Sequence, residues 1–249
     1  MEQDLTKGNL WKQILVFSFP LMISNVLQVL FNMADVAVVG RFAGSIALGA
    51  VGSTTTLVTL FTGLLIGMAG GVNVLVARFY GAKKEKDVQE TTHTAVIICL
   101  LTGILIMVLG LLFANGILEL LHTKDELIEG AALYLRIYFL GMPALAIYNF
   151  GNAVFSAVGN TKKPLYYLAT AGVINIILNL FFVIVCKLDV AGVALASIIS
   201  QYTSAILILR ALFMTKEIYG LKLSMLKPNS QKAGMILSVF RRTIFIADN

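Results

Sequence analysis

The chain has 249 residues, of which 58% are hydrophobic and 13% are charged, and its formal net charge is +6. A soluble domain carries about 25% charged residues, so this composition excludes a soluble globular protein and predicts an integral membrane protein. The positive charge does not indicate nucleic-acid binding, because in so apolar a chain the basic residues mark loops between membrane spans. Cys99 and Cys186 both lie in apolar runs, which predicts core positions rather than a disulfide or a metal site.

Six apolar windows are long enough to cross a hydrocarbon core, which takes roughly 20 helical residues. They cover residues 13–39, 46–77, 93–115, 127–156, 165–186 and 190–213. We therefore predict an all-α membrane protein with a six-transmembrane-helix bundle over residues 1–215. Residues 216–249 are more polar and are predicted to be a cytoplasmic tail. The apolar patch at 233–240 within this tail is either an amphipathic surface segment or a disordered end.

The basic residues divide unevenly between the two ends of these windows. Fifteen Lys and Arg residues fall on the side of the two termini, three on the other side, and Arg136 lies within the fourth window. The positive-inside rule then predicts a protein integral to the cell membrane with both termini in the cytoplasm.

The first window contains Asp35, the only acidic residue well inside an apolar stretch. A charge at the bilayer centre costs about 2.5–3.5 kcal/mol on insertion scales, so such residues are rare and mostly functional. Three amide side chains precede it at intervals of three or four residues, which puts all four groups on one helix face. The three amides are Asn25, Gln28 and Asn32. Pro20 removes one backbone donor from the same window and predicts a hinge there, as Pro143 predicts a kink in the fourth.

Polar side chains recur at helical spacing in three later windows. They are Asn149, Asn152 and Ser156 in the fourth, Asn175 and Asn179 in the fifth, and Ser197, Gln201 and Ser204 in the sixth. One interpretation is a set of hydrogen bonds between helices, each worth roughly 0.6–2 kcal/mol. The other is a solvated polar cavity, which we favour because the amides converge with an ionisable residue. Glycines within the spans, such as Gly103, predict close helix packing.

Motifs for enzymatic chemistry are missing from the sequence. It has no Gly-rich phosphate loop, no nucleophile elbow and no His-Glu-x-x-His segment. We therefore predict no enzyme, no cofactor and no nucleic-acid partner.

Four segments, in order along the chain, resemble the N-terminal lobe of the multidrug and toxic compound extrusion (MATE) family of transporters. They are residues 20–35 (PLMISNVLQVLFNMAD), 77–84 (ARFYGAKK), 157–164 (AVGNTKKP), and 175–179 (NIILN) followed by 190–197 (VAGVALAS). The resemblance covers about residues 1–228. It implies one six-helix lobe of a twelve-helix transporter that exchanges Na⁺ or H⁺ for an organic cation or another amphiphilic drug.

The resemblance also implies roles for individual residues. Asp35 matches the acidic residue of the family's first helix, Asn175 and Asn179 match the polar pair of its fifth, and Ser197 stands where the sixth often has a hydroxyl. Na⁺ would bind at Asp35, Asn175 and Asn179, and two cations would compete for one carboxylate. Some members have a second acid where this chain has Asn179, so a mechanism with two carboxylates in this lobe is not expected. The further cation- or substrate-binding residues that we predict are Gln28, Asn32, Asn149, Asn152 and Ser197, with Pro20 as a hinge.

The length implies half a transporter, truncated before the second lobe, with residues 216–249 as the start of the inter-lobe linker. The predicted partners are a small amphiphilic or cationic substrate, membrane lipid, and either the missing second lobe or another copy of the chain. One alternative is a flippase for lipid or polysaccharide precursors, which should have a larger, cationic cavity. The other is a non-transporting remnant or interaction protein.

Overall fold

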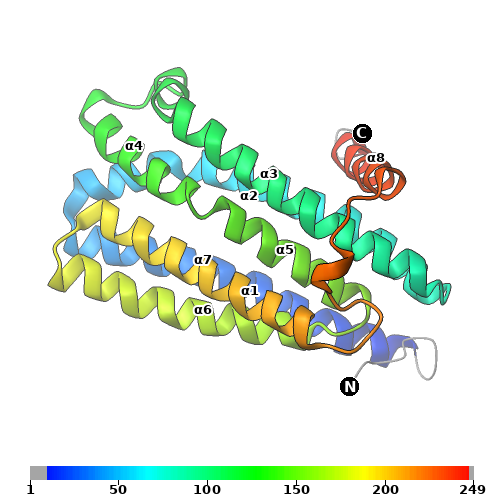
Figure 1. Cartoon of the computed structure of the whole chain (residues 1–249). Coiled ribbons are helices and arrows are strands. Elements are labelled where there is room, and N and C mark those ends of the chain that lie inside the picture. The colour runs from blue at the N-terminus through cyan, green and yellow to red at the C-terminus, as the bar shows by residue number, and fades with distance from the viewer. Residues whose placement is uncertain (1–9, 247–249) are drawn as a thin grey trace.

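The computed structural model describes residues 10–246, apart from the side chains of residues 10, 12–14, 17, 25, 32 and 243–246. All regular secondary structure within this range is helical. Figure 1 shows long helices running side by side in one bundle, with a shorter helix, α8, lying across them. The predicted all-α fold is confirmed.

Five of the predicted spans are confirmed as long helices. They are α1 (Leu10–Phe42), α2 (Gly44–Gly81), α3 (Glu85–Leu120), α6 (Lys162–Leu180), which continues into the π-helical turn η1 (Phe181–Val185), and α7 (Asp189–Met214). Each contains a stretch that is long and apolar enough to cross a membrane. α1 continues through Pro20, where the Ser24 hydroxyl donates to the Pro20 carbonyl oxygen at 2.9 Å.

The fourth predicted span, 127–156, is two helices rather than one. α4 (Asp125–Phe139) and α5 (Met142–Ala157) meet at a bend of 48°, and the pair together is long and apolar enough for a sixth crossing. Pro143 lies in the first turn of α5, where its missing N–H would have no intrahelical partner. The break at residues 140–141 thus replaces the simple kink that the proline predicts.

α5 lies at the centre of the bundle. It packs against α2, α3 and α7, and nearly all of its side chains are buried. A helix that is apolar on every side needs neighbours all round it. Gly103 of α3 permits a close approach to the α5 backbone, because a Cβ added there would lie 2.8 Å from the Pro143 Cα and 2.9 Å from the Met142 carbonyl oxygen.

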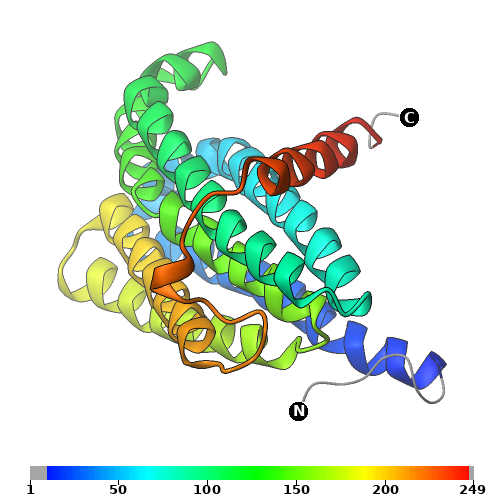
Figure 2. The same cartoon turned by 45° about the vertical axis from the view of Figure 1, so that its right-hand side comes forward.

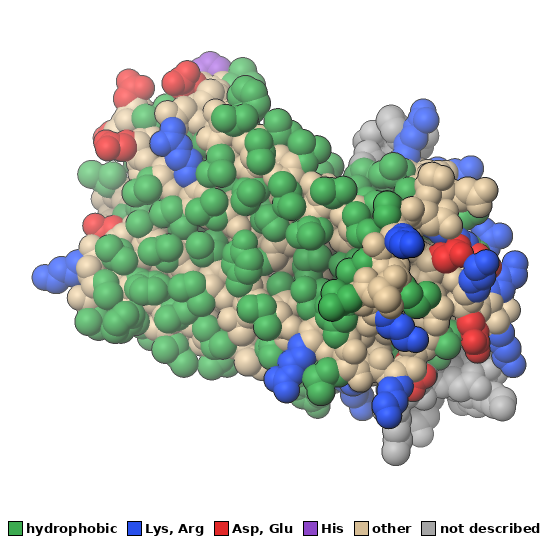
Figure 3. Space-filling model, viewed as in Figure 1, with side chains coloured by type: hydrophobic (Ala, Val, Ile, Leu, Met, Phe, Trp, Pro, Cys, Tyr) green, Lys and Arg blue, Asp and Glu red, His purple; other side chains and the backbone are tan. Residues whose placement is uncertain are grey.

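The outer surface of the bundle is largely apolar along its length. Figure 3 shows hydrophobic side chains over the middle of one face, with most Lys and Arg at one end and several Asp and Glu at the other. Large exposed hydrophobics such as Leu105 and Leu112 of α3 fit contact with lipid tails. The charge division matches the predicted loops, and the orientation in the cell stays a prediction.

The two cysteines differ in environment. Both are free, and Cys99 is buried in the core as predicted. The prediction for Cys186 is wrong, because this residue follows η1 at a helix end and is exposed.

The segment after α7 is folded onto the bundle. It buries Tyr219 and Leu221, forms the 3-10 turn η2 (Leu223–Met225), and ends in α8 (Ser230–Ile246). α8 packs against α2 and α3, and Figure 2 shows it crossing both. Of the two interpretations of residues 233–240, the structure therefore supports the amphipathic surface segment. The division of the chain into a lobe and a tail at residue 215 stays a prediction.

We predict that Gly103→Ala lowers the thermal unfolding midpoint of the purified chain in detergent. The new methyl group would meet two backbone atoms of α5 that cannot turn aside, and overpacking of this kind typically costs about 1–3 kcal/mol. Gly116→Ala is the matched control, since it lies in the same helix with nothing within 4 Å of the added Cβ. Equal midpoints for the two variants would contradict the close contact.

Candidate functional site

Asp35 is held by hydrogen bonds from two other helices. It lies two turns before the end of α1, on the side that packs against α6 and α7, and only 9% of its surface is exposed. The Asn179 amide of α6 donates to Asp35 Oδ1, and the Ser197 hydroxyl of α7 donates to Oδ2 at 3.2 Å. Both carboxylate oxygens therefore have a neutral donor.

These contacts close into a ring of four polar side chains, which we call the Asp35 ring. Asn179 Nδ2 also donates to Asn175 Oδ1 at 3.2 Å, and Asn175 Nδ2 lies 3.5 Å from Ser197 Oγ. Asn175 and Asn179 are one turn apart on α6, so the helical repeat itself aligns them. The ring thus joins α1, α6 and α7 through Asp35, Asn179, Asn175 and Ser197, all of which are buried.

A cavity of about 160 Å³ lies against this ring. Asp35, Asn175 and Ser197 line it, whereas the fully buried Asn179 lies behind them. Its other polar lining comes from Gln28, Thr62, Asn149, Ser200, Gln201 and Ser204. The ring is therefore open to a small ligand from one side.

The structure places most of the predicted site residues at this cavity. Gln28 lines it, and so does Asn149, whose amide donates to the Leu145 carbonyl oxygen at 2.9 Å. Asn152 neither lines the cavity nor contacts the Asp35 ring, and its side-chain oxygen accepts from Ser156 Oγ at 3.4 Å within α5. The predicted side chains of Asn25 and Asn32 lie outside the described part of the structure.

Aromatic side chains form a second part of the wall, which sequence reasoning missed. Tyr134 and Tyr138 of α4 stack with ring centroids 5.7 Å apart, and Phe31 and Tyr148 complete the aromatic lining. The four-residue spacing of the two tyrosines is the only signal in the sequence, and the same spacing is typical of a packed core. The bend between α4 and α5 separates these tyrosines from the rest of the predicted fourth span.

The donor set suits a hard monovalent cation better than a transition metal. Among the described residues no group of three or more His, Cys, Asp or Glu could hold a metal ion. The Asp35 ring instead offers carboxylate, amide and hydroxyl oxygens, the ligand type that hard cations take. Asn179 Oδ1 is buried without a hydrogen-bond partner in the described structure, so this amide oxygen has no competing donor.

The cavity has one formal negative charge and no counter-charge within its described lining. The described lining residues include no Lys, Arg or His, and Asp35 is their only acidic member. A buried charge without a partner is unfavourable, so the site favours a bound cation or a protonated carboxyl.

A protein-family model described as MatE matches residues 20–181. The chain belongs to the MatE family. It is 34% identical over 200 residues to the probable multidrug resistance protein YpnP of Bacillus subtilis (strain 168), a match that covers 80% of this chain and 44% of that protein. It is 25% identical over 232 residues to the probable multidrug resistance protein NorM of Thermotoga maritima, covering 92% of this chain and 50% of that protein.

Solved structures of MATE transporters share the fold. A crystal structure of MATE in the bent conformation superposes with a TM-score of 0.87 at 25% identity, covering 94% of this chain and 52% of that one. A transporter of the MOP superfamily from Pyrococcus furiosus also gives 0.87 at 25% identity, covering 95% and 52%. The resemblance to one lobe of a MATE transporter is confirmed, and this MatE chain spans about half the length of the relatives and structures it matches.

We predict that Asn179→Leu destabilises the chain and that Asp35→Leu offsets part of the loss. Asn179→Leu alone leaves the buried Asp35 Oδ1 without its hydrogen-bond donor, at a typical cost of about 1–3 kcal/mol. Replacing both partners by apolar groups can be nearly neutral. Unfolding free energies of the two single variants and the double variant should show a coupling of about 0.5–3 kcal/mol.

Asn152→Leu serves as the control for this cycle, because Asn152 makes its hydrogen bond within α5. It should show no coupling with Asp35→Leu. Additive effects of Asn179→Leu and Asp35→Leu would contradict the Asp35 ring.

Proposed function

We propose that this chain forms the cation-binding lobe of a transporter that moves small organic cations out of the cell in exchange for Na⁺ or H⁺. The observation that carries the proposal is Asp35, a buried carboxylate facing a cavity whose described lining has no basic side chain. Membership of the MatE family supports drug efflux, since relatives such as YpnP are probable multidrug resistance proteins. The coupling ion and the substrate are our own inference from the site.

Exchange follows from competition for one negative site. The Asp35 carboxyl is stable in a dry cavity when it carries a proton or when a cation lies beside it. Na⁺ would take oxygens from Asp35, Asn175 and Asn179, with Ser197 in reach through the ring. An organic cation that displaces this ion gains the same charge contact, so the two occupants exclude each other.

The aromatic wall supports an organic rather than an inorganic cargo. Phe31, Tyr134, Tyr138 and Tyr148 line the same cavity as Asp35, Asn175 and Ser197. A cation near the face of a tyrosine or phenylalanine ring gains about 0.5–2 kcal/mol, most when both are desolvated. A flat or alkylated cation can therefore be held between the rings and the carboxylate.

Coupling requires that occupancy of the site changes the shape of the lobe. Asp35 ties α1 to α6 and α7, so loss of the carboxylate's hydrogen bonds would release this helix. We propose Pro20 as the hinge. Pro20 has no backbone N–H, so α1 lacks one intrahelical hydrogen bond at this point, four turns before Asp35. Switching of this kind needs a ligand that binds two shapes with different affinity.

We also propose that a second lobe completes the pathway. The relatives that this chain matches are about twice as long, and the cavity here is built from one bundle alone. The second lobe would correspond to the other half of these relatives, or another copy of this chain would take its place. Both termini would lie in the cytoplasm, as the distribution of Lys and Arg predicts.

A flippase for anionic lipid or polysaccharide precursors is less well supported. Such a cargo needs basic groups in the cavity, and the one basic residue predicted within a span, Arg136, lies outside the described lining of this cavity. Arg136 instead donates to Asn115 Oδ1 at 3.4 Å on the bundle exterior. A chain that transports nothing would be distinguished by the experiment below.

We predict that Asp35→Asn abolishes ion-driven dye efflux by a complete transporter that carries this lobe. The variant keeps a hydrogen-bonding group of the same shape but removes the charge for which the two cations compete. Efflux of a cationic dye from cells or vesicles, driven by an imposed Na⁺ or H⁺ gradient, measures the effect.

Asn152→Asp is the matched control, because it adds a carboxyl to a span outside the cavity lining and should leave efflux by the wild-type site in place. Undiminished, gradient-driven efflux by the Asp35→Asn variant would contradict a role of Asp35 in coupling. Failure of the assembled wild-type transporter to move dye would favour the non-transporting alternative.

A further inference from the structure

The segment that follows α7 is bound tightly on one side. Lys232 of α8 is only 6% exposed, pairs with Asp87 of α3, and lies 4.1 Å from the centre of the Phe79 ring of α2. Ile236, one turn later, is fully buried over Gly71, where an added Cβ would lie 3.0 Å from the Ile236 carbonyl oxygen. One face of α8 is therefore committed to α2 and α3.

The linker before α8 is fixed to the same end of α3. The Asn229 backbone N–H donates to Thr94 Oγ1 at 3.1 Å, and its amide donates to Glu90 Oε2 at 3.1 Å. The Lys222 backbone N–H donates to His93 Nε2 at 2.9 Å. Residues 222–236 thus have a defined path, and their outer side is a fixed surface of the molecule.

This outer side is basic and apolar at once, and we call it the basic strap. Residues 216–246 contain six Lys and Arg but one acidic residue, Glu217. Five of the six basic residues are exposed, and four large apolar side chains are exposed among them. The basic members are Lys216, Lys222, Lys227, Arg241 and Arg242, and the apolar members are Leu223, Met225, Met235 and Leu237.

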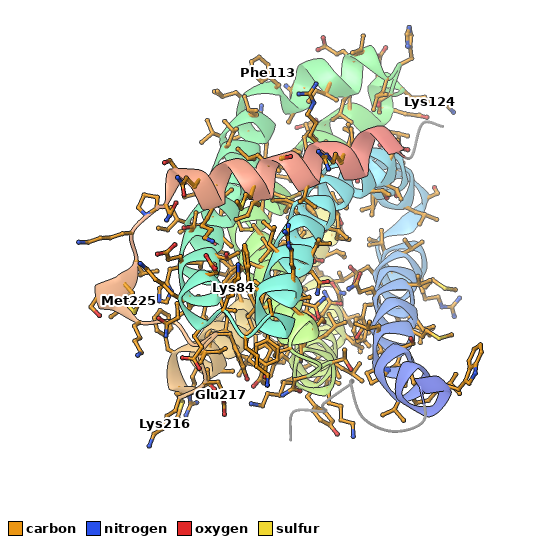
Figure 4. The ribbon with its side chains drawn as sticks, turned by 90° about the vertical axis from the view of Figure 1, so that its right-hand side faces the viewer. Lys84, Phe113, Lys124, Lys216, Glu217 and Met225 are labelled. Atoms are coloured by element: carbon orange, nitrogen blue, oxygen red, sulfur yellow. The ribbon has the colours of Figure 1, made fainter. Side chains whose placement is uncertain are left out.

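The basic strap lies across the bundle rather than along it. In Figure 1 the spanning helices run across the picture while α8 is seen nearly end-on. Figure 4 views the molecule from the right-hand side of Figure 1, and there α8 extends across the field, Lys216 and Glu217 lie together at the bottom, and Met225 lies between them and α8. A helix set across a transmembrane bundle runs roughly parallel to the membrane plane.

We propose that the basic strap binds the anionic phospholipid headgroups of the bilayer that the bundle spans. It directly follows the membrane-spanning helix α7, and four to eight basic residues at such a position are typical of binding to anionic lipid. The exposed apolar side chains would enter the boundary between headgroups and acyl chains, as in interfacial amphipathic helices. The positive charge of the basic strap is complementary to the negative charge of these headgroups. An acidic protein segment is the alternative partner that the test must distinguish.

The test is hydrogen–deuterium exchange of the full chain in lipid nanodiscs of phosphatidylcholine alone or with phosphatidylglycerol. Each basic residue near an anionic surface strengthens binding roughly fivefold, so we expect the amides of residues 230–242 to exchange at least several-fold more slowly with phosphatidylglycerol. High salt should reverse the effect, because it screens exposed charges. The buried helix α5 is the internal reference and should not change.

The decisive variant is the triple change Lys227→Gln, Arg241→Gln and Arg242→Gln, which leaves the buried contacts of Lys232 and Ile236 in place. It should lose the slowing by phosphatidylglycerol. A matched control removes three basic residues of the opposite predicted side, Arg41→Gln, Lys124→Gln and Lys187→Gln, and should keep it.

Three outcomes would overturn the proposal. The first is equal exchange of residues 230–242 in neutral and anionic nanodiscs, and the second is slowing by phosphatidylglycerol that persists in the triple variant. The third is slowing by an added acidic peptide such as polyglutamate in phosphatidylcholine nanodiscs without any slowing by phosphatidylglycerol, which would identify a protein partner. None of these outcomes depends on transport by the lobe.

Discussion

The hydrogen bonds to the Asp35 carboxylate are the contacts on which the other features of this lobe depend. They come from Asn179 on α6 and Ser197 on α7, so a single side chain of α1 holds three helices together. All the donors are neutral, and the described lining of the cavity beside the carboxylate has no cation. The protein thus supplies hydrogen bonds to the Asp35 carboxylate but no positive charge within the described lining. A bound cation or a proton would neutralise it.

The rest of the bundle supplies the rigid frame that such a site requires. α5 is buried at the centre, and its close contact with α3 at Gly103 fixes the position of the bend from α4. Tyr134 and Tyr138, on α4 before this bend, line the cavity together with Asp35, Asn175 and Ser197. On the outside, Asn229 and Lys232 tie the segment after α7 to the start of α3. The frame and the site are therefore linked by the same few helices.

The sequence predicted the parts of this structure that depend on local periodicity. The spans, the helical face of Asp35 and the pairing of Asn175 with Asn179 all follow from apolar length and a repeat of 3.6 residues. Ser197 was found from its polar neighbours and from the family resemblance. These signals are strong because a polar group in an apolar helix needs a partner, whatever the fold.

The parts that the sequence did not predict depend on contacts between distant segments. The break at residues 140–141 arises where α5 packs against Gly103, and a proline alone predicts only a kink. The aromatic lining comes from α1, α4 and α5 together, and nothing in the sequence around a single tyrosine indicates that it will line a cavity. Asn149 and Asn152 are three residues apart on α5 and both make a hydrogen bond within that helix, but only Asn149 lines the cavity. Likewise, nothing in residues 216–249 indicated that Lys232 would be buried against Phe79.

The central claim is that two cations compete for the Asp35 carboxylate, and equilibrium binding of tetraphenylphosphonium to the purified chain tests it most directly. The probe is a lipophilic organic cation, and its apparent Kd is measured over a series of Na⁺ concentrations at constant ionic strength and then over a series of pH values. The account predicts that the apparent Kd rises in proportion to the concentration of one of these ions, and that this dependence disappears in Asp35→Asn. An apparent Kd that is independent of both Na⁺ and pH, with unchanged binding in Asp35→Asn, would contradict it.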